Sequence, residues 1–392
     1  MIYGGVDFTP YFDKDELIDL LGELVKRRSE SSEGREYEAA VFSENYMREM
    51  GLDTRLQETQ DNRPNVIGTW KGTRGDKALL FNGHLDVVPV EPSQWRSPPY
   101  QITECNGRLY GRGTADMKGG IAAALYAVKV LQKAGVRLKG DLKFVFTVDE
   151  ELLNIGVKKV VEDPKGLKAN WCIVGEPTGL DIAIGCRGLL VIDVEFEGVS
   201  CHAAQEQLGQ NAVYMALPFM EEIQKLNEAY KRNPHPILGP ATVNVTVIRG
   251  GEKENVIPDR CLVRLDRRLI PGSGKEKALA DVKEILNRLN LEAKVTSCAF
   301  LNYAETSAED PLVKTLKQHI EAVGRSPEIT DFKASCEAPW FQDDLGLTTL
   351  TFGPGLIAQA HTVDEFVDIG ELVDAAKVYI TLYMDLLGFY RV

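Results

Sequence analysis

The sequence predicts an α/β fold: a mostly parallel sheet with helices on both faces, plus an inserted ferredoxin-like α+β domain. The first observation behind this prediction is that the outer parts of the chain alternate short apolar runs with amphipathic stretches. Parallel strands need a crossover connection, usually a helix, so this alternation is typical of α/β sheets. The second observation is a change in the order of elements between residues 189 and 300.

The outer sheet is predicted from short apolar runs, whose length suits strands buried on both faces. We expect strands over 78–81, 142–148, 171–174 and 347–352, with helices over 121–131 and from about 369 to the C-terminus. Because these segments lie on both sides of the inner segment, residues 1–188 and 301–392 are expected to form one domain.

The inner segment is predicted to follow the order βαββαβ. Strands are expected over 189–197, 242–248, 261–269 and 291–300, and helices over 210–230 and 275–288. This order is the split βαβ pattern of a ferredoxin-like domain. Pro218 lies within the first helix, where it should kink or break the helix. Residues 189–300 are therefore expected to form a second, inserted domain.

Composition and charge exclude several classes of function. The 392 residues suffice for about two or three domains. With 45 Lys and Arg against 58 Asp and Glu, the net charge is -13, which disfavours nucleic acid as a partner. The first residues have neither the basic nor the apolar region of a secretory signal, and no run of about 18 uncharged apolar residues follows, so a soluble protein without a secretory signal is expected. Seven scattered cysteines without C-x-x-C spacing indicate a reducing cytoplasm rather than a disulfide framework.

Histidine and acidic side chains follow the predicted buried strands or begin the helix after them. In an open α/β sheet, ligands bind just beyond the carboxyl ends of the strands. A set of His, Asp and Glu without thiolate suits Zn, Co or Mn in a hydrolytic site. The candidates are His84, Asp116, Glu150, Glu151, Glu176 and His361.

Each candidate taken singly has a plainer interpretation. His84 and Glu176 could be turn residues, Glu150 and Glu151 a solvated charge pair, and Asp116 a helix cap. Their occurrence together at one predicted edge of the sheet favours a metal-dependent hydrolase.

Eight ordered motifs resemble those of the M20 metallopeptidases and amidohydrolases, a family that includes acetylornithine deacetylase, succinyl-diaminopimelate desuccinylase, aminoacylase and several dipeptidases. They span Asn82 to Glu365 and are NGHLDVVP, YGRGTADMKGG, TVDEE, VGEPTG, GCRG, NVIPD, DRRLIPG and HTVDE. The resemblance implies two divalent metal ions, zinc being expected and cobalt or manganese the alternatives.

The resemblance also implies roles for individual residues near the metals. Asp86 resembles the residue that orients a histidine ligand, and Glu150 resembles the general base. The metal ligands that the resemblance implies are His84 and Glu176 for one ion, Glu151 and His361 for the other, and Asp116 as the bridge between them.

His202, in the inserted segment, resembles the family's lid-domain histidine, which donates to the oxyanion, commonly across a dimer interface. A homodimer is therefore expected, and 189–300 is expected to serve as the lid and dimerisation domain. From the residues alone, a capping or core histidine is the plainer interpretation.

Four further residues fall where the family holds a substrate carboxylate: Asn244, Arg268, Gly353 and Gly355. Arg267 and Arg268 are adjacent, so strand alternation lets only one of them face the cleft. The family pattern favours Arg268, because a guanidinium binds a carboxylate through two hydrogen bonds. A surface salt bridge is the alternative for either arginine.

The implied function is cleavage of the amide bond of a small N-acyl amino acid, in the manner of a deacetylase or desuccinylase. A metal-dependent dipeptidase or carboxypeptidase, acting on a short peptide, is the alternative. Leu152, Leu153 and Asn154 stand where the family often has a glycine- and serine-containing turn, which leaves the substrate open. A non-catalytic binding homologue is a third hypothesis, against which all the implied ligands and the base are present.

Overall fold

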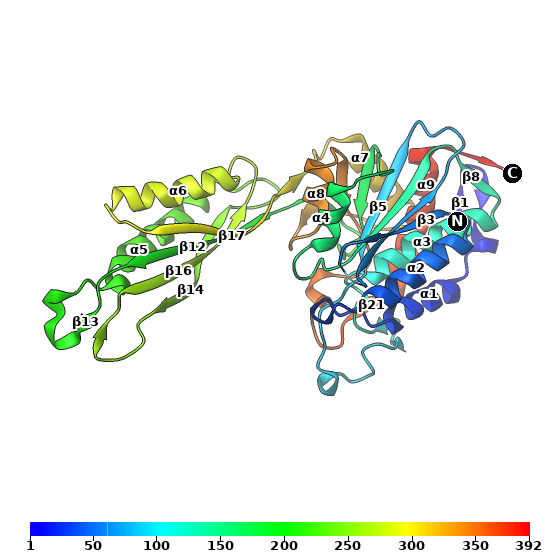
Figure 1. Ribbon diagram of the computed structural model, residues 1–392. Helices are drawn as coiled ribbons and strands as arrows, with labels where there is room; N and C mark the ends of the chain where they lie inside the picture. The colour runs from blue at the N-terminus through cyan, green and yellow to red at the C-terminus, as the bar shows by residue number, and fades with distance from the viewer. Residues whose placement is uncertain (61) are drawn as a thin grey trace. The chain divides into compact units, whose positions relative to one another are not determined.

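The computed structural model describes residues 1–60 and 62–392 and consists of two compact units (Figure 1). The larger unit comprises Met1–Ile184 and Thr306–Val392, and the inserted unit comprises Gly185–Glu305. The boundaries thus fall after 184 and 305, where the sequence suggested 188 and 300. The two chain segments that lead into and out of the inserted unit pair with each other as antiparallel strands, Gly185 with Glu305 and Cys186 with Ala304. This pairing places the boundary within the paired strands.

The larger unit is built on a nine-stranded sheet whose four central strands are mutually parallel. In spatial order these are β20 (Thr348–Thr351), β10 (Trp171–Val174), β5 (Ala78–His84) and β9 (Asp141–Thr147). Every residue of β5 is buried, as expected for a strand covered on both faces. The outer strands pair antiparallel and are β4 (Pro64–Trp70), β3 (Asp53–Glu58), β11 (Ile182–Cys186) and β18 (Ala304–Glu305), with β19 (Ile329–Phe332) paired to β11.

Helices lie on both faces of this sheet, which confirms the predicted fold class (Figure 1). One face carries α1 (Lys14–Lys26), α2 (Tyr37–Glu49), α3 (Lys118–Lys133) and α9 (Ile369–Leu387), and the other carries α4 (Ile155–Glu162) and α8 (Ala338–Asp343), while α7 (Pro311–Ala322) packs on α9. Glycines let α3 approach the strand ends closely. A Cβ atom at Gly120 would lie 2.1 Å from the carbonyl oxygen of Gly175, the residue before Glu176.

Short strands complete the larger unit. One small sheet has the order β21-β7-β6, in which Phe366 pairs with Tyr110, and it brings the segment after His361 beside the segment before Asp116. In the described part of the chain no helix is long and apolar enough to cross a membrane. The short strands are β1 (Ile2–Tyr3), β2 (Val6–Asp7), β6 (Thr103–Cys105), β7 (Arg108–Tyr110), β8 (Val136–Leu138), β21 (Phe366–Asp368) and β22 (Phe389–Arg391).

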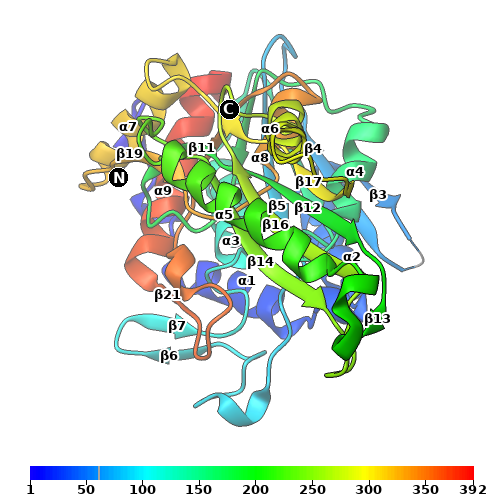
Figure 2. The same ribbon diagram turned by 90° about the vertical axis from the view of Figure 1, so that its left-hand side faces the viewer.

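The inserted unit has the predicted order βαββαβ. Its antiparallel sheet has the spatial order β14-β16-β12-β17, the ferredoxin-like arrangement, and both helices pack on one face (Figure 2). Residues of β12 alternate between buried and partly exposed, so one side of the strand meets the helices. The elements are β12 (Gly188–Glu197), α5 (Ala212–Tyr230), β14 (Thr242–Gly250), β16 (Arg260–Leu269), α6 (Lys275–Arg288) and β17 (Lys294–Leu301), with the two-residue strands β13 (Cys201–His202) and β15 (Val256–Ile257) beside them.

Pro218 does not end the first helix of this unit. Helix α5 runs on from Ala212 to Tyr230 with Pro218 inside it. Ala216 and Phe219 on either side of the proline are buried in the core of the unit. The tertiary packing of this face outweighs the hydrogen bond that proline cannot donate.

Candidate metal centre and active site

The ends of three adjacent parallel strands carry predicted metal ligands. Strand β5 ends at His84, β9 is followed by Glu150 and Glu151, and β10 is followed by Glu176. Because carboxyl ends of parallel strands meet at one edge of a sheet, the local sequence order places these side chains together. Asp116 comes from the other direction, two residues before α3 begins.

Asp116 lies between two histidine–glutamate pairs. Nε2 of His84 is 3.0 Å from Oδ1 of Asp116 and 3.6 Å from Oε1 of Glu176. Nε2 of His361 is 3.4 Å from Oδ2 of Asp116 and 2.9 Å from Oε2 of Glu151. Ligand atoms of His84, Asp116 and Glu151 all lie within 4.8 Å of one another, a group that could hold a metal ion. The structure therefore brings all five implied ligands together, two on either side of one carboxylate.

The charges of this cluster fit divalent cations. Burial raises the pKa of Glu176 well above its usual value, and the Asp116 carboxylate raises it further. Hydrogen bonds to Asp116 and Glu151 raise the pKa of His361 to about 10. The buried carboxylates thus favour the protonated forms of Glu176 and His361, which reduces the net negative charge of the cluster. Nitrogen and carboxylate oxygen donors in this arrangement suit two divalent metal ions.

Asp86 contacts the cluster through its backbone carbonyl and through its carboxylate. Its backbone carbonyl accepts a hydrogen bond from Nδ1 of His84 at 2.9 Å, whereas its Oδ1 is 3.6 Å from that nitrogen. This contact places the ring proton on Nδ1 and leaves Nε2 free to bind a metal. The carboxylate of Asp86 accepts the backbone N–H groups of Glu150 and Glu151, both at 3.1 Å. Asp86 therefore orients the glutamate pair as well as the histidine.

Glu150 is placed to hold a proton beside the ligands. Burial raises the pKa of its carboxyl group well above the usual value; His84 lowers that pKa, and the carboxylate of Glu151 raises it. The turn that carries Glu150 is fixed by Asp149, which has φ of 63° and accepts a hydrogen bond from Arg63 at 2.7 Å. The two leucines after Glu151, Leu152 and Leu153, are 51% and 60% exposed, so their side chains do not belong to the buried core.

Three buried charged residues near the site were missed by the sequence analysis. Lys118 donates from Nζ to the carbonyls of Leu24 and Arg27, at 3.0 Å each. Oε2 of Glu337 accepts hydrogen bonds from Asn82 and Thr147 at 2.7 Å. Glu365 accepts hydrogen bonds from the loop before Asp116. Lys118 lies in the motif YGRGTADMKGG and Glu365 in HTVDE, so the motifs could have identified both residues. Glu337 lies in none of the eight motifs.

The three site residues predicted in the inserted unit, His202, Asn244 and Arg268, are exposed or partly exposed, whereas the neighbouring Arg267 is buried. Arg267 is fully buried and donates to Asp281 at 2.8 Å and to the hydroxyl of Tyr230 at 2.5 Å. Arg268, on the other face of β16, is 36% exposed and bonds Asp266 of its own strand. The pairing of Arg267 inside the core leaves Arg268 as the arginine that could reach a ligand.

His202 and Asn244 are both exposed on the inserted unit. Nδ1 of His202 accepts a hydrogen bond from the backbone N–H of Ala204 at 3.1 Å, so the side chain caps the short helix that follows. In the neutral ring this contact places the proton on Nε2. Oδ1 of Asn244 accepts a hydrogen bond from Asn227 at 3.4 Å.

The two glycines predicted to bind substrate have a packing role in the structure. A Cβ atom at Gly353 would lie 2.5 Å from the carbonyl oxygen of Gly175 and 2.7 Å from that of Glu176. Gly355 has φ of 87°, a conformation that favours glycine, and its N–H already donates to Glu371 at 2.9 Å. The glycine turn therefore lets β20 approach the strand end that carries Glu176.

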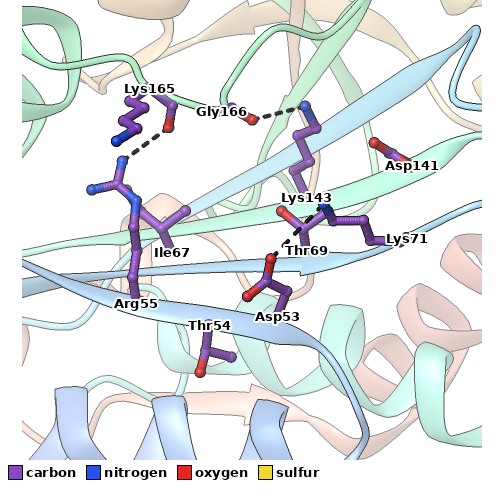
Figure 3. Close-up of a pocket in the computed structure, with 10 residues that line it drawn as sticks. All are labelled: Asp53, Thr54, Arg55, Ile67, Thr69, Lys71, Asp141, Lys143, Lys165 and Gly166. Carbon is purple, nitrogen blue, oxygen red and sulfur yellow. Dashed lines mark hydrogen bonds and ion pairs between the residues drawn. The ribbon is translucent and has the colours of Figure 1, made fainter.

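A separate pocket of the larger unit contains none of the predicted site residues (Figure 3). Its volume is about 320 Å³, and it lies over strands β3, β4 and β9. Three of the basic side chains that Figure 3 labels already have partners: Arg55 and Lys143 donate to the carbonyls of Lys165 and Gly166, and Lys71 lies 3.9 Å from Asp53. We therefore assign no ligand to this pocket.

Comparison with known proteins places this site in a family. Acetylornithine deacetylase of Myxococcus xanthus is 35% identical over 334 residues, 82% of this chain and 84% of that protein. Succinyl-diaminopimelate desuccinylase 2 of Alteromonas mediterranea is 29% identical and covers 95% of this chain and 99% of its own. The M20 family metallo-carboxypeptidase Sso-CP2 of Sulfolobus solfataricus shares the fold with a TM-score of 0.77 at 22% identity, over 95% of this chain and 99% of that chain. Residues 80–385 match Peptidase family M20/M25/M40, so the chain belongs to this family and is a hydrolase.

Proposed function

We propose that the protein is a dinuclear-metal-dependent hydrolase that cleaves the amide bond of a small N-acyl amino acid. The observation that carries the proposal is the position of Asp116 between two histidine–glutamate pairs, with the protonatable carboxyl of Glu150 beside them. The names of two sequence relatives, a deacetylase and a desuccinylase, support the class of substrate. Zinc is the metal we expect, with cobalt or manganese as alternatives.

The residues of the site divide the work of amide hydrolysis. When bound, the two ions supply Lewis-acid polarisation of the scissile carbonyl and lower the pKa of the attacking water. Glu150 accepts a proton from that water and returns it to the nitrogen of the leaving amine. A carboxyl whose pKa is raised by burial suits the first step, because it accepts a proton more readily than an exposed carboxylate does, and as an acid it can then donate that proton. Asp86 keeps the Glu150 carboxyl in place through its bond to the Glu150 N–H group.

The inserted unit is proposed to supply the remaining contacts as a lid. The exposed Nε2–H of His202 suits donation to the oxyanion of the tetrahedral intermediate. The exposed fork of Arg268 suits a substrate carboxylate, and Asn244 is the second polar group that we assign to the substrate. These roles are proposals that rest on the family motifs and on the exposure of the three side chains.

A homodimer is part of the proposal. Strand β14 lies at the edge of the inserted sheet, and large apolar side chains on α5 and β14 are exposed: Tyr214 by 70%, Leu217 by 47% and Ile248 by 49%. An unpaired edge beside exposed apolar residues suits pairing with a second copy of the chain. We expect the dimer to work in the cytoplasm, where the seven cysteines would stay reduced.

A peptidase remains the alternative function, because Arg268 would bind the terminal carboxylate of a dipeptide as well as that of an N-acyl amino acid. The test is a panel of N-acetyl, N-succinyl and N-formyl amino acids and dipeptides, assayed for kcat/KM with Zn-loaded and with metal-free enzyme. We expect at least one N-acyl amino acid to exceed every dipeptide by about 100-fold or more. A dipeptide as the best substrate would overturn the deacylase assignment, and Glu150→Gln enzyme, which should be inactive on the whole panel, controls for contaminating hydrolases.

A further inference from the structure

Glu365 is a buried carboxylate that is fully occupied by the loop before Asp116. Its Oε1 accepts the backbone N–H groups of Ala115 at 2.8 Å and of Asp116 at 3.1 Å. Its Oε2 accepts the N–H of Gly113 at 3.0 Å and Nη1 of Arg112 at 2.6 Å. Both oxygens therefore receive two donors each, and Glu365 is 0% exposed.

Glu365 also belongs to the segment that carries His361. The two residues are four positions apart, just before β21, and the Glu365 carbonyl accepts the N–H of Gly111 at 2.9 Å. Nε2 of His361 lies 3.4 Å from the Asp116 carboxylate. Asp116 is thus held by one segment at two points: its backbone by Glu365 and its carboxylate by His361.

We propose that Glu365 is a positioning residue that sets the distance between Asp116 and His361 and thereby the affinity of the ion shared by Glu151 and His361. This inference rests on the proposed metal site. Glu365 touches neither the ligand atoms nor, by this assignment, the substrate; it acts through the backbone of Asp116 and through its own segment.

The two proposed ions should depend on Glu365 to different degrees. His84 is the last residue of the buried strand β5, and Glu176 follows β10 by two residues, so the sheet holds these ligands. His361 lies in a connection where φ is 62° for His361 and 56° for Asp364, and its ring is 53% exposed. The buried contacts of Glu365 therefore connect the His361 segment to the loop that carries Asp116.

The test is Glu365→Gln in the full-length protein, stripped of metal and titrated with Co²⁺ by calorimetry and visible absorption. A carboxamide matches the shape of the carboxylate but offers one acceptor oxygen, so its NH₂ group faces two donors. We expect one of two Co²⁺ steps to lose about 10- to 100-fold in affinity, the usual effect of losing a group that orients a ligand, while the other step changes by less than about threefold.

Asp281→Asn in the inserted unit is the matched control, because Asp281 is also a buried carboxylate bonded to a buried arginine, Arg267. It should lower the unfolding midpoint and leave both Co²⁺ steps unchanged. Glu365→Asp, which keeps the charge but shortens the reach, and Arg112→Met, which removes one donor, should weaken the same step and serve if Glu365→Gln does not fold.

Equal weakening of both steps, or unchanged affinities in a folded Glu365 variant, would overturn the inference. Wild-type protein that binds fewer than two Co²⁺ ions would instead refute the proposed metal site, so the two failures can be told apart.

Discussion

Replacing each of the twin arginines by methionine separates a structural from a substrate-binding role. Arg267 is fully buried, and its guanidinium donates to Asp281, Tyr230 and Ser273. Breaking a buried ion pair costs about 3–5 kcal/mol of unfolding free energy, and we expect the lower end of this range for Arg267→Met because Lys277 still pairs with Asp281. Arg268 bonds Asp266 at 3.0 and 3.2 Å at the partly exposed surface, where such a pair contributes about 0–1 kcal/mol. Arg268→Met should therefore leave stability nearly unchanged.

Kinetics should show the reverse order. Two charge-assisted hydrogen bonds to a substrate carboxylate contribute about 3 kcal/mol, so Arg268→Met should lower kcat/KM about 100-fold, mainly through KM. Arg267→Met, assayed at a temperature where it stays folded, should change KM less than about threefold. Urea unfolding followed by fluorescence and circular dichroism measures the first effect, and Michaelis kinetics on the best N-acyl amino acid measures the second.

The carboxamide form of the same substrate is the internal control, because it lacks the carboxylate that Arg268 is proposed to bind. The kcat/KM of wild-type enzyme should be about 100-fold lower on the carboxamide than on the carboxylate. On the carboxamide, the kcat/KM of Arg268→Met should be only slightly lower than that of wild type. If Arg268→Met is equally impaired on both substrates, or if Arg267→Met raises KM without loss of stability, the assignment of the two arginines is wrong.

Three further outcomes are expected of the metal centre and the lid. Purified protein should contain up to two divalent metal ions per chain, and a chelator should abolish hydrolysis until metal is restored; full activity in metal-stripped protein would contradict the mechanism. Glu150→Gln should keep its metal by elemental analysis yet lose about 10²- to 10⁴-fold in kcat, since the amide cannot carry the proton, whereas loss of metal in proportion to activity would make Glu150 a ligand. His202→Ala should lower kcat about 100-fold, and mixing it with Glu150→Gln chains should restore activity if His202 serves the partner's site; failure to do so when subunits exchange argues against donation in trans.

The fold could be predicted from the sequence where local pattern decides the structure. The apolar run at 171–174 is the whole of β10, and the alternation at 189–197 lies within β12. The candidate ligands followed from the same logic, because the residue after a buried parallel strand reaches the carboxyl edge of the sheet. That rule made His84 and Glu176 candidates, and the family resemblance implied that both bind a metal ion. In the structure Nε2 of His84 lies 3.6 Å from Oε1 of Glu176.

The parts that sequence could not predict depend on contacts between distant segments. Strands β3 and β4, which pair antiparallel beyond β9, were not predicted from the sequence, and periodicity would not have shown their direction, because strand direction is set by the connection and the partner. Glu337 reaches the site from the start of α8 to accept hydrogen bonds from Asn82 on β5 and Thr147 on β9, 255 and 190 residues away. Nothing in the residues around Glu337 signals those partners.

The buried carboxylates of the larger unit fall into two groups by the donors that satisfy them. Glu365 accepts four N–H donors, and Asp86 accepts two backbone N–H groups, so the chain itself offsets part of the burial that raises the pKa of both carboxyl groups. The carboxylates of Asp116, Glu151 and Glu176 instead meet the rings of His84 and His361. Charge that the protein solvates with its own donors serves to fix geometry. The negative charge of the second group is offset by protons that the two imidazoles and Glu176 retain, and bound divalent cations would displace those protons. The division explains why so many carboxylates can be buried in one place. Glu365 and Asp86 bind backbone N–H groups, whereas the remaining carboxylates gather negative charge that divalent metal ions would neutralise.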